Sequence, residues 1–235
     1  GRVDVQITGV NDAPVARADQ ISLGQNQSIS FNPLSNDSDI DHNDSIQITG
    51  VSSQQGNAGI VGIGLDGKTL TYTAAGKFDS IPRGQATSET FTYTIADKAG
   101  ATSTAQVNVT ISGDNDKPVV VNDTIAVTED QAISFNPAGN DTDPDQGDKV
   151  RVSAVSNPAT NKGVAQVDGS GNQVTYSAIN HFESLPEGGI AQETFSYTAV
   201  DNNGGSSPGT VTVNITGVND APVAVNDAIQ VTEDS

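Results

Sequence analysis

Short segments in which apolar and hydroxyl-bearing residues alternate are the main pattern along this chain. Alternation with a period of two places the apolar side chains on one face of a β-strand, so each segment predicts a half-buried strand. Turn signals such as Asp66-Gly67 and 202–205 separate the segments, and no helical periodicity of useful length occurs. About six or seven such strands per 100 residues indicate an all-β, immunoglobulin-like sandwich, whose core holds the strand tyrosines and phenylalanines. The clearest segments are 69–73, 90–95, 107–111, 174–176, 194–198 and 211–215.

The whole pattern repeats with a fixed period, and this self-similarity predicts the domain organisation. The motif at Gly9 returns at Gly113 and at Gly217, an offset of 104 residues each time. The same offset aligns aromatic, proline and acidic positions without an insertion or deletion. We therefore expect the parent protein to carry further copies. The expected divisions are 1–11, the end of a preceding repeat with its linker; 12–115, repeat one; 116–219, repeat two; and 220–235, the start of a following repeat.

Composition limits the interactions that can hold such a chain together. The 235 residues include 29 acidic and 10 basic ones, for a net charge of −19. That charge disfavours nucleic acid and anionic membranes as partners and favours divalent cations. Cysteine is absent, which excludes disulfides and thiolate metal sites. The longest apolar runs are a few residues, so membrane insertion is not expected, and bound cations are the obvious alternative staple.

Two acidic runs, 37–44 and 141–148, occupy equivalent positions of the two repeats. Carboxylates so close together repel one another unless a cation lies among them, and Ca²⁺ takes about six to eight oxygen ligands in a flexible geometry. A solvated acidic turn is the alternative, but two runs in register favour calcium. Neither run is an EF-hand, because the twelfth positions are Ile48 and Val152. The aspartates of the runs are Asp37, Asp39, Asp41 and Asp44, and Asp141, Asp143, Asp145 and Asp148.

Further candidate ligands lie in the linkers and beside the strands. Each linker begins with an Asn-Asp-x-Pro motif, whose proline restricts the preceding residue to extended geometry. Carboxylates of neighbouring repeats that share an ion at such a linker would turn a hinge into a fixed joint. The candidate ligands outside the acidic runs are Asn11, Asp12, Glu89, Asp97, Asn115, Asp116, Glu129, Glu193, Asp201, Asn219 and Asp220.

Taken together, these motifs resemble the cadherin-like, VCBS-type tandem repeats of bacterial RTX adhesins. The resemblance covers essentially the whole chain. It implies tandem immunoglobulin- or cadherin-like Greek-key β-sandwich domains in a secreted protein of the bacterial cell surface, exported by type I secretion. The segments that carry it are 218–224, 127–130, 140–143, 194–197, and Asp201 with Gly204-Gly205.

The resemblance also implies how calcium ligands are shared, because animal cadherins combine linker Asx residues with an Asp-x-Asp pair and a later Asp before Gly. Gln25 stands where repeat two has Glu129, so the junction that uses Gln25 is expected to hold fewer or weaker ions. The implied ligands are Asn11, Asp12, Asp37, Asp39 and Asp97 before repeat one; Asn115, Asp116, Asp141, Asp143, Asp201 and Glu89 between the repeats; and Asn219, Asp220, Glu129 and Glu193 after repeat two.

The expected function is that of a calcium-rigidified extender or adhesive region of a bacterial surface adhesin, acting in cell adhesion and biofilm formation. The alternative is a calcium-dependent module that binds carbohydrate or a matching repeat, although no tryptophan marks such a site. An enzyme is disfavoured, because the only histidines are His42 and His181 and no nucleophile or phosphate-loop motif occurs. The expected partners are adjacent repeats of the same chain, with a cell-surface glycan or protein as a further candidate. The chain is expected to be monomeric and extracellular.

Overall fold

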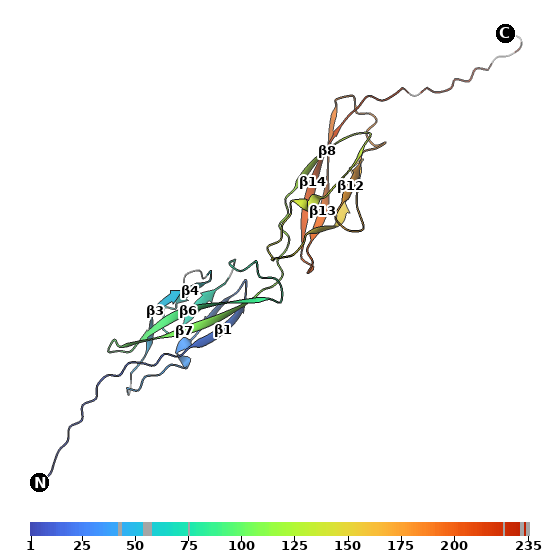
Figure 1. Ribbon diagram of the computed structural model, residues 1–235. Helices are drawn as coiled ribbons and strands as arrows, with labels where there is room; N and C mark the ends of the chain where they lie inside the picture. Colours follow the sequence, from blue (N-terminus) through green and yellow to red (C-terminus); the bar gives the residue numbers. More distant parts are fainter. Residues whose placement is uncertain (42–43, 54–57, 75, 223, 231–232, 234–235) are drawn as a thin grey trace. The chain divides into compact units, whose positions relative to one another are not determined.

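Two compact units make up the computed structural model, which describes residues 1–41, 44–53, 58–74, 76–222, 224–230 and 233. The first unit comprises Gly1–Asp116 and Asp143–Asp148, and the second comprises Lys117–Thr142 and Lys149–Ser235. Each unit is built from β-strands and one short 3-10 turn (Figure 1). The all-β prediction is therefore confirmed.

The first unit has seven strands in two sheets within its described residues. One sheet has the order β1-β7-β6-β3, in which β1 runs parallel to β7, and the other has the order β2-β5-β4. The 3-10 turn η1, Pro33–Ser35, follows β2. The strands are β1 Asp19–Gly24, β2 Ser28–Phe31, β3 Gln47–Ser53, β4 Ile60–Ile63, β5 Leu70–Thr73, β6 Ala86–Ala96 and β7 Thr102–Ser112.

The second unit repeats this topology in its described residues. Its sheets have the orders β8-β14-β13-β10 and β9-β12-β11, with β8 parallel to β14 and the turn η2, Pro137–Gly139, after β9. The strands are β8 Asp123–Thr128, β9 Ala132–Phe135, β10 Arg151–Ser156, β11 Val164–Val167, β12 Val174–Ser177, β13 Ile190–Val200 and β14 Ser206–Thr216.

The period-two alternation of apolar and polar residues corresponds to alternating buried and exposed positions, as the sequence predicts. In β7, Val107, Val109 and Ile111 are completely buried, while the residues between them are more exposed. The alternation predicts a strand from Thr90, but β6 begins at Ala86 because its pairing with β7 continues to the end of that strand. Residues before Thr90 therefore lie in the sheet and not in a turn.

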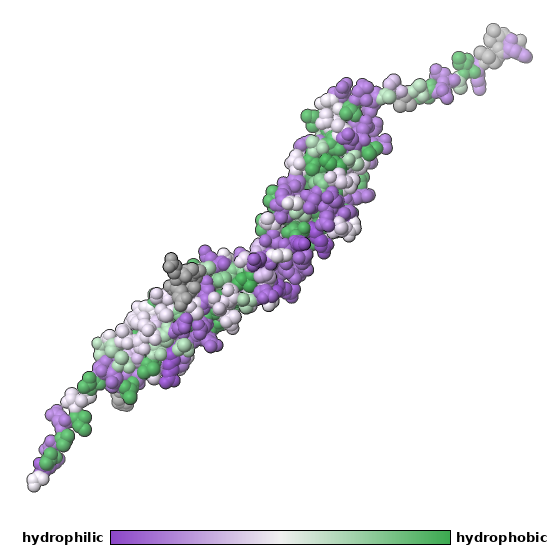
Figure 2. Space-filling view, viewed as in Figure 1, coloured by the Kyte–Doolittle hydropathy of each residue, from purple (hydrophilic) through white to green (hydrophobic). Residues whose placement is uncertain are grey.

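Each sandwich has its own hydrophobic core. Tyr72 stacks on Phe91 in the first unit and Tyr176 on Phe195 in the second, with ring centroids 6.1 Å apart in both cases. All four rings are buried, as the sequence predicts for the strand aromatics. On the face shown in Figure 2, hydrophilic residues are intermixed with residues of intermediate and hydrophobic character. Because such small cores supply limited stability, further interactions at the ends of the sandwich can add to the stability of the fold.

Replacing Phe195 by alanine tests whether the cores are separate. Phe195 is 0% exposed, so its truncation is expected to cost about 3–5 kcal/mol in the free energy of unfolding. Calorimetry of the full chain is expected to show two transitions, of which Phe195→Ala lowers one and the equivalent Phe91→Ala lowers the other. A single transition that both variants lower equally would contradict separate cores.

Candidate metal centres

Three groups of carboxylates lie at the ends of the sandwiches. Among the described residues, these are the groups of three or more acidic side chains that can bring ligand oxygens within 4.8 Å of one another. Each of the two predicted acidic runs supplies one of these groups, so aspartates that are close in the sequence are also close in space. The groups are Asp39, Asp41 and Asp44; Asp143, Asp145 and Asp148; and Asp130, Glu183 and Asp220.

The group around Asp145 is the most enclosed. Asp145 is 2% exposed, and its Oδ2 accepts a hydrogen bond of 2.9 Å from the backbone N–H of Asp116. Its Oδ1 is buried and has no hydrogen-bond partner in the described part of the chain. The buried Oδ1 of Asp79 is in the same state, with no described partner. A buried charged oxygen without a donor is costly, so these two atoms are oriented for a ligand that carries positive charge.

The electrostatics of Asp116 show that these carboxylates act on one another. Burial raises the pKa of Asp116, and the negative charges of Asp79 and Asp145 raise it further. Gln25 opposes this effect, because its Nε2 donates a hydrogen bond of 2.7 Å to Asp116 Oδ2. The linker aspartate therefore lies in an environment that disfavours additional negative charge and favours a cation.

Local backbone structure explains why the run folds beside the linker. Val119 and Thr142 form an isolated antiparallel bridge, with N–H to O distances of 2.7 and 3.0 Å. The bridge holds the start of the acidic run against the residues that follow the Asn-Asp-x-Pro motif. Asp143 then accepts a hydrogen bond from the Asp145 N–H at 2.9 Å, which is the Asx turn expected of aspartate in this position.

The equivalent group of repeat one has the same pattern of hydrogen bonds. Asp41 Oδ2 accepts from the N–H of Asp12 at 2.8 Å, and Asp39 Oδ1 accepts from the N–H of Asp41 at 2.8 Å. Asp39 Oδ2 is buried without a hydrogen-bond partner among the residues described. Asn11 donates to Asp97 Oδ2 at 2.8 Å, and this bond is the main reason that the pKa of Asp97 is lowered. His42, which the sequence places in this run, lies outside the described residues.

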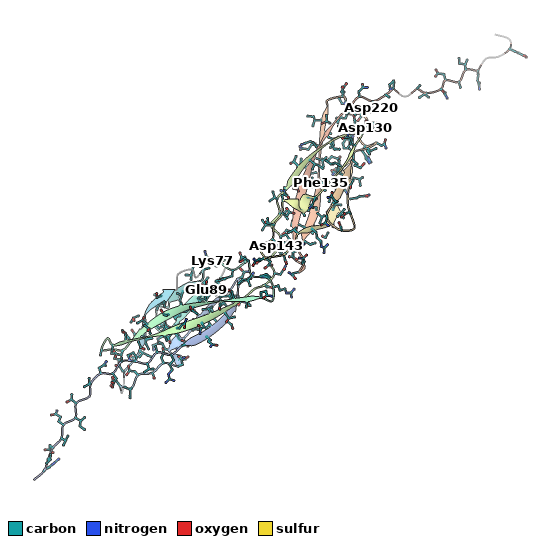
Figure 3. All side chains as sticks on the ribbon, viewed as in Figure 1. Lys77, Glu89, Asp130, Phe135, Asp143 and Asp220 are labelled. Carbon is teal, nitrogen blue, oxygen red and sulfur yellow. The ribbon has the colours of Figure 1, made fainter. Side chains whose placement is uncertain are left out.

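The third group lies at one end of the second unit, where Figure 3 shows Asp130 beside Asp220. Glu129, which precedes Asp130 in the sequence, is 0% exposed. Its Oε1 accepts a hydrogen bond of 2.7 Å from Val218 N–H, whereas its Oε2 is buried with no partner in the ranges described. This oxygen is a further acceptor that needs positive charge.

Asp201 braces the turn between β13 and β14. Its Oδ1 accepts from the N–H groups of Asn203, Gly204 and Gly205 at 2.7, 2.6 and 2.9 Å. Gly204 has a φ of +99°, which a residue with a side chain rarely adopts. Asp201 is thereby fixed in position, but it does not belong to the three groups.

Asp37 and Asp141 are placed differently from the implied ligand sets, because neither joins the three groups. Asp141 accepts hydrogen bonds from the Tyr197 hydroxyl, at 2.9 Å to Oδ2, and from the Val121 N–H. It lies near Asp123, whose Oδ2 is buried without a described partner. Asp37 repeats this arrangement with Tyr93 and Asp19. These pairs lie within a sandwich and form a separate acidic feature of each repeat.

Glu89 and Glu193 also have a local role in the structure, within β6 and β13. Glu193 accepts hydrogen bonds from Lys162 N–H, from Gly163 N–H and from the Tyr176 hydroxyl. Glu89 makes the equivalent contacts with Ala58, Gly59 and Tyr72. Burial and then Glu89 raise the pKa of Tyr72. Because donors already occupy their oxygens, we leave these two glutamates out of the proposed metal sites.

Two acidic residues near the groups are missed by sequence reasoning. Asp79 and Glu183 each stand alone in the sequence, outside any acidic run. Their signal is the repeat itself, since they are 104 residues apart and both follow a buried phenylalanine. A search for acidic residues conserved between the two copies, without a requirement for clustering, would have found them.

Comparison with known families defines the class of both repeats. Residues 11–113 match the family model of the bacterial cadherin-like domain, and residues 115–214 match that of a bacterial Ig domain. Each repeat thus matches one family model, a bacterial cadherin-like domain for the first and a bacterial Ig domain for the second, which confirms the predicted cadherin-like class. No curated protein matches the chain significantly.

Solved cadherin ectodomains are similar to this chain at low identity. Human desmocollin-1 has 12% identity over 90% of this chain and 42% of its own, with a TM-score of 0.47. Drosophila N-cadherin EC1-4 has 19% identity over 89% and 50%, with a TM-score of 0.48. The chain spans about half the length of these two ectodomains. Mouse PcdhgC3 EC1-3 has 18% identity over 91% and 70%, with a TM-score of 0.41.

Within the described residues, no helix has the length and apolar character needed to cross a membrane.

Replacing Asp123 by asparagine tests the acidic pair inside repeat two. Burial raises the pKa of Asp123, and the charge of Asp141 raises it further. The charged form therefore destabilises the folded state above the raised native pKa, and this effect disappears below the unfolded value of about 3.9. Asp123→Asn is expected to raise the free energy of unfolding by about 1 kcal/mol at pH 7 in chelator, the typical cost of one unsatisfied buried acceptor.

The gain should shrink as the pH falls from above the raised native pKa of Asp123 towards about 4 and be absent below that, which urea unfolding at several pH values would measure. A loss of stability at pH 7, or a gain that does not depend on pH, would contradict this account of the pair.

Proposed function

We propose that this chain is a calcium-binding extender region of a bacterial surface adhesin, in which ions at the linkers hold each sandwich and its linker together. The buried, unpartnered Oδ1 of Asp145 is the observation that carries the proposal. That atom lies in a group with Asp143 and Asp148, and in the same acidic environment as Asp79 and Asp116. Oxygen ligands alone, many of them charged, are the set that Ca²⁺ prefers.

The donor set favours calcium over the other common cations. Cysteine is absent and no histidine belongs to the three groups of the described residues, so the ligands of zinc and copper are missing. Mg²⁺ requires near-octahedral geometry and gives up its water reluctantly, whereas Ca²⁺ accepts irregular sets of carboxylate and carbonyl oxygens. A linker and an adjacent loop supply such an irregular set.

Chain connectivity gives the ion a mechanical role. Asp116 precedes and Asp143 follows the segment 117–142, so an ion held by both closes a chain loop of that length. The linker proline removes one rotation, and the ion would remove others. A linker restrained in this way transmits force along a tandem array, in which each repeat contacts only its neighbours.

The usual roles of this class of domain support the placement of the chain in a surface adhesin. Bacterial cadherin-like and immunoglobulin-like domains are typical of surface proteins, in which they are typically structural or adhesion modules. We place this chain in the extracellular, repetitive region of an adhesin of the RTX type, acting in cell adhesion and biofilm formation after type I secretion. Calcium is low before export and high outside the cell, so the linkers would stiffen only once the chain had reached the cell surface.

Thermal unfolding of the full chain with calcium and with chelator tests this function. A ligand at 100 times its dissociation constant stabilises the folded state by about 2.7 kcal/mol, so calcium is expected to raise the melting temperature by several degrees. Asp145→Asn is expected to reduce this rise while leaving the melting temperature in chelator equal or higher, because it removes a repelling charge.

Asp4→Asn is the matched control, since it removes one charge from an exposed side chain outside the three groups. It should leave the calcium response unchanged. An equal melting temperature in calcium and in chelator would contradict the proposed function, as would a response that magnesium reproduces in full.

A further inference from the structure

Gln25 and Glu129 occupy equivalent positions, 104 residues apart, and both side chains are buried, at 1% and 0% exposure. Each follows the first strand of its repeat and hydrogen-bonds through its own N–H to the end of the last strand, at Ser112 and Thr216. One side-chain oxygen of each residue accepts a hydrogen bond from a backbone N–H at the equivalent position of its repeat. Gln25 Oε1 accepts from the N–H of Asp114 at 3.1 Å, and Glu129 Oε1 accepts from the N–H of Val218 at 2.7 Å.

The second terminal atom makes the difference between the two repeats. In repeat one it is the amide Nε2 of Gln25, which donates to Asp116 Oδ2 at 2.7 Å and to the carbonyl of Asp114 at 3.4 Å. In repeat two it is Glu129 Oε2, which is buried and has no partner in the described ranges of the chain. Asp220, the equivalent of Asp116, instead lies in the group with Asp130 and Glu183.

The orientation of the Gln25 amide follows from its neighbours. A backbone N–H faces one terminal atom, which must be the oxygen, and a carboxylate and a carbonyl face the other, which must be the nitrogen. The amide therefore presents partial positive charge to Asp116 from within the fold. In repeat two the equivalent space is bounded by a bare carboxylate oxygen, which needs a cation or a proton from outside.

We infer that the Gln25 amide takes the place of one calcium ion, so that the linker aspartate Asp116 after repeat one is held partly by a hydrogen bond, whereas the equivalent Asp220 after repeat two is held by metal. This inference rests on the proposed function, because it concerns the number of ions at sites of that kind. The residue at this position sets the calcium requirement of a linker: glutamate makes it metal-dependent, and glutamine makes it partly independent of metal.

The two ends consequently respond differently to calcium. With chelator, Asp116 keeps its bond to Gln25, and the first residues of the linker stay in place. With chelator, Glu129 is left with an unneutralised buried oxygen, so the chain around Val218 opens more readily. As calcium rises, the residues that Gln25 holds change less than the residues around Glu129, which become ordered.

Exchanging the two residue types in the full 235-residue chain tests the inference. Calcium binding is measured by isothermal titration and equilibrium dialysis for Gln25→Glu, for Glu129→Gln and for the control Gln27→Glu. Gln27 is exposed in the same turn and accepts from Gly24 N–H through its oxygen, a bond that glutamate retains. Gln25→Glu is expected to bind one more Ca²⁺ per chain and Glu129→Gln one fewer, while Gln27→Glu binds the wild-type number.

The melting temperature in chelator gives a second test, in which the two variants are expected to shift it in opposite directions. Gln25→Glu should lower the melting temperature, because it removes the bond to Asp116 and adds a repelling charge, and calcium should restore it. Glu129→Gln should raise the melting temperature in chelator and gain less from calcium. Native-state hydrogen exchange should show strongly calcium-dependent protection at Val218 and a smaller calcium dependence of protection at Asp114.

The outcomes separate this inference from the function on which it rests. A wild-type chain that binds no calcium overturns both. A wild-type chain that binds calcium, with Gln25→Glu and Glu129→Gln both binding the same number of ions at the same affinity, overturns this inference alone. Equal calcium dependence of exchange at Asp114 and Val218 would also contradict it.

Discussion

The repulsion between carboxylates that the backbone holds close together is the constraint on which the rest of the structure depends. Asp145 is the clearest case, since the Asp116 N–H fixes one of its oxygens while the other is buried with no described partner. The fold does not relieve this repulsion by moving the acids apart. It anchors them with an isolated bridge and an Asx turn, which leaves a divalent cation as the natural source of neutralising charge. In the proposed function, the stability of the sandwich end, the restraint of the linker and the dependence on calcium would all be consequences of this one interaction.

Much of the fold follows from the sequence because period-two alternation and an insertion-free repeat are both long-range, redundant signals. The buried residues Val107, Val109 and Ile111 of β7 are those that the alternation selects. The start of β6 is missed, because its first residues pair with β7 without an apolar stripe to mark them. Where a strand is held by backbone pairing alone, side-chain pattern contains no information about its end.

The candidate site could be predicted only in part, for a different reason. Acids adjacent in sequence, such as Asp143 and Asp145, are brought together as expected, whereas Asp79 reaches the same environment from a distant segment that carries no acidic run. Conversely, Asp141 belongs to the same acidic run, but its carboxylate contacts Tyr197 and does not join the group. Sequence spacing shows that acids are close along the chain, but the side of the backbone on which each carboxylate lies depends on tertiary contacts. The same limit applies to Gln25, whose departure from glutamate is visible in the sequence, while the amide contact with Asp116 is visible only in three dimensions.

A crystal structure of the full chain grown in millimolar calcium chloride tests the central claim most directly. The account predicts an ion, identified by its anomalous scattering, within about 2.3–2.6 Å of Asp145 Oδ1, with oxygens of the same acidic group completing its shell. Carboxylates that remain in place but contact only water, or that turn outward to solvent with no ion between them, would contradict it.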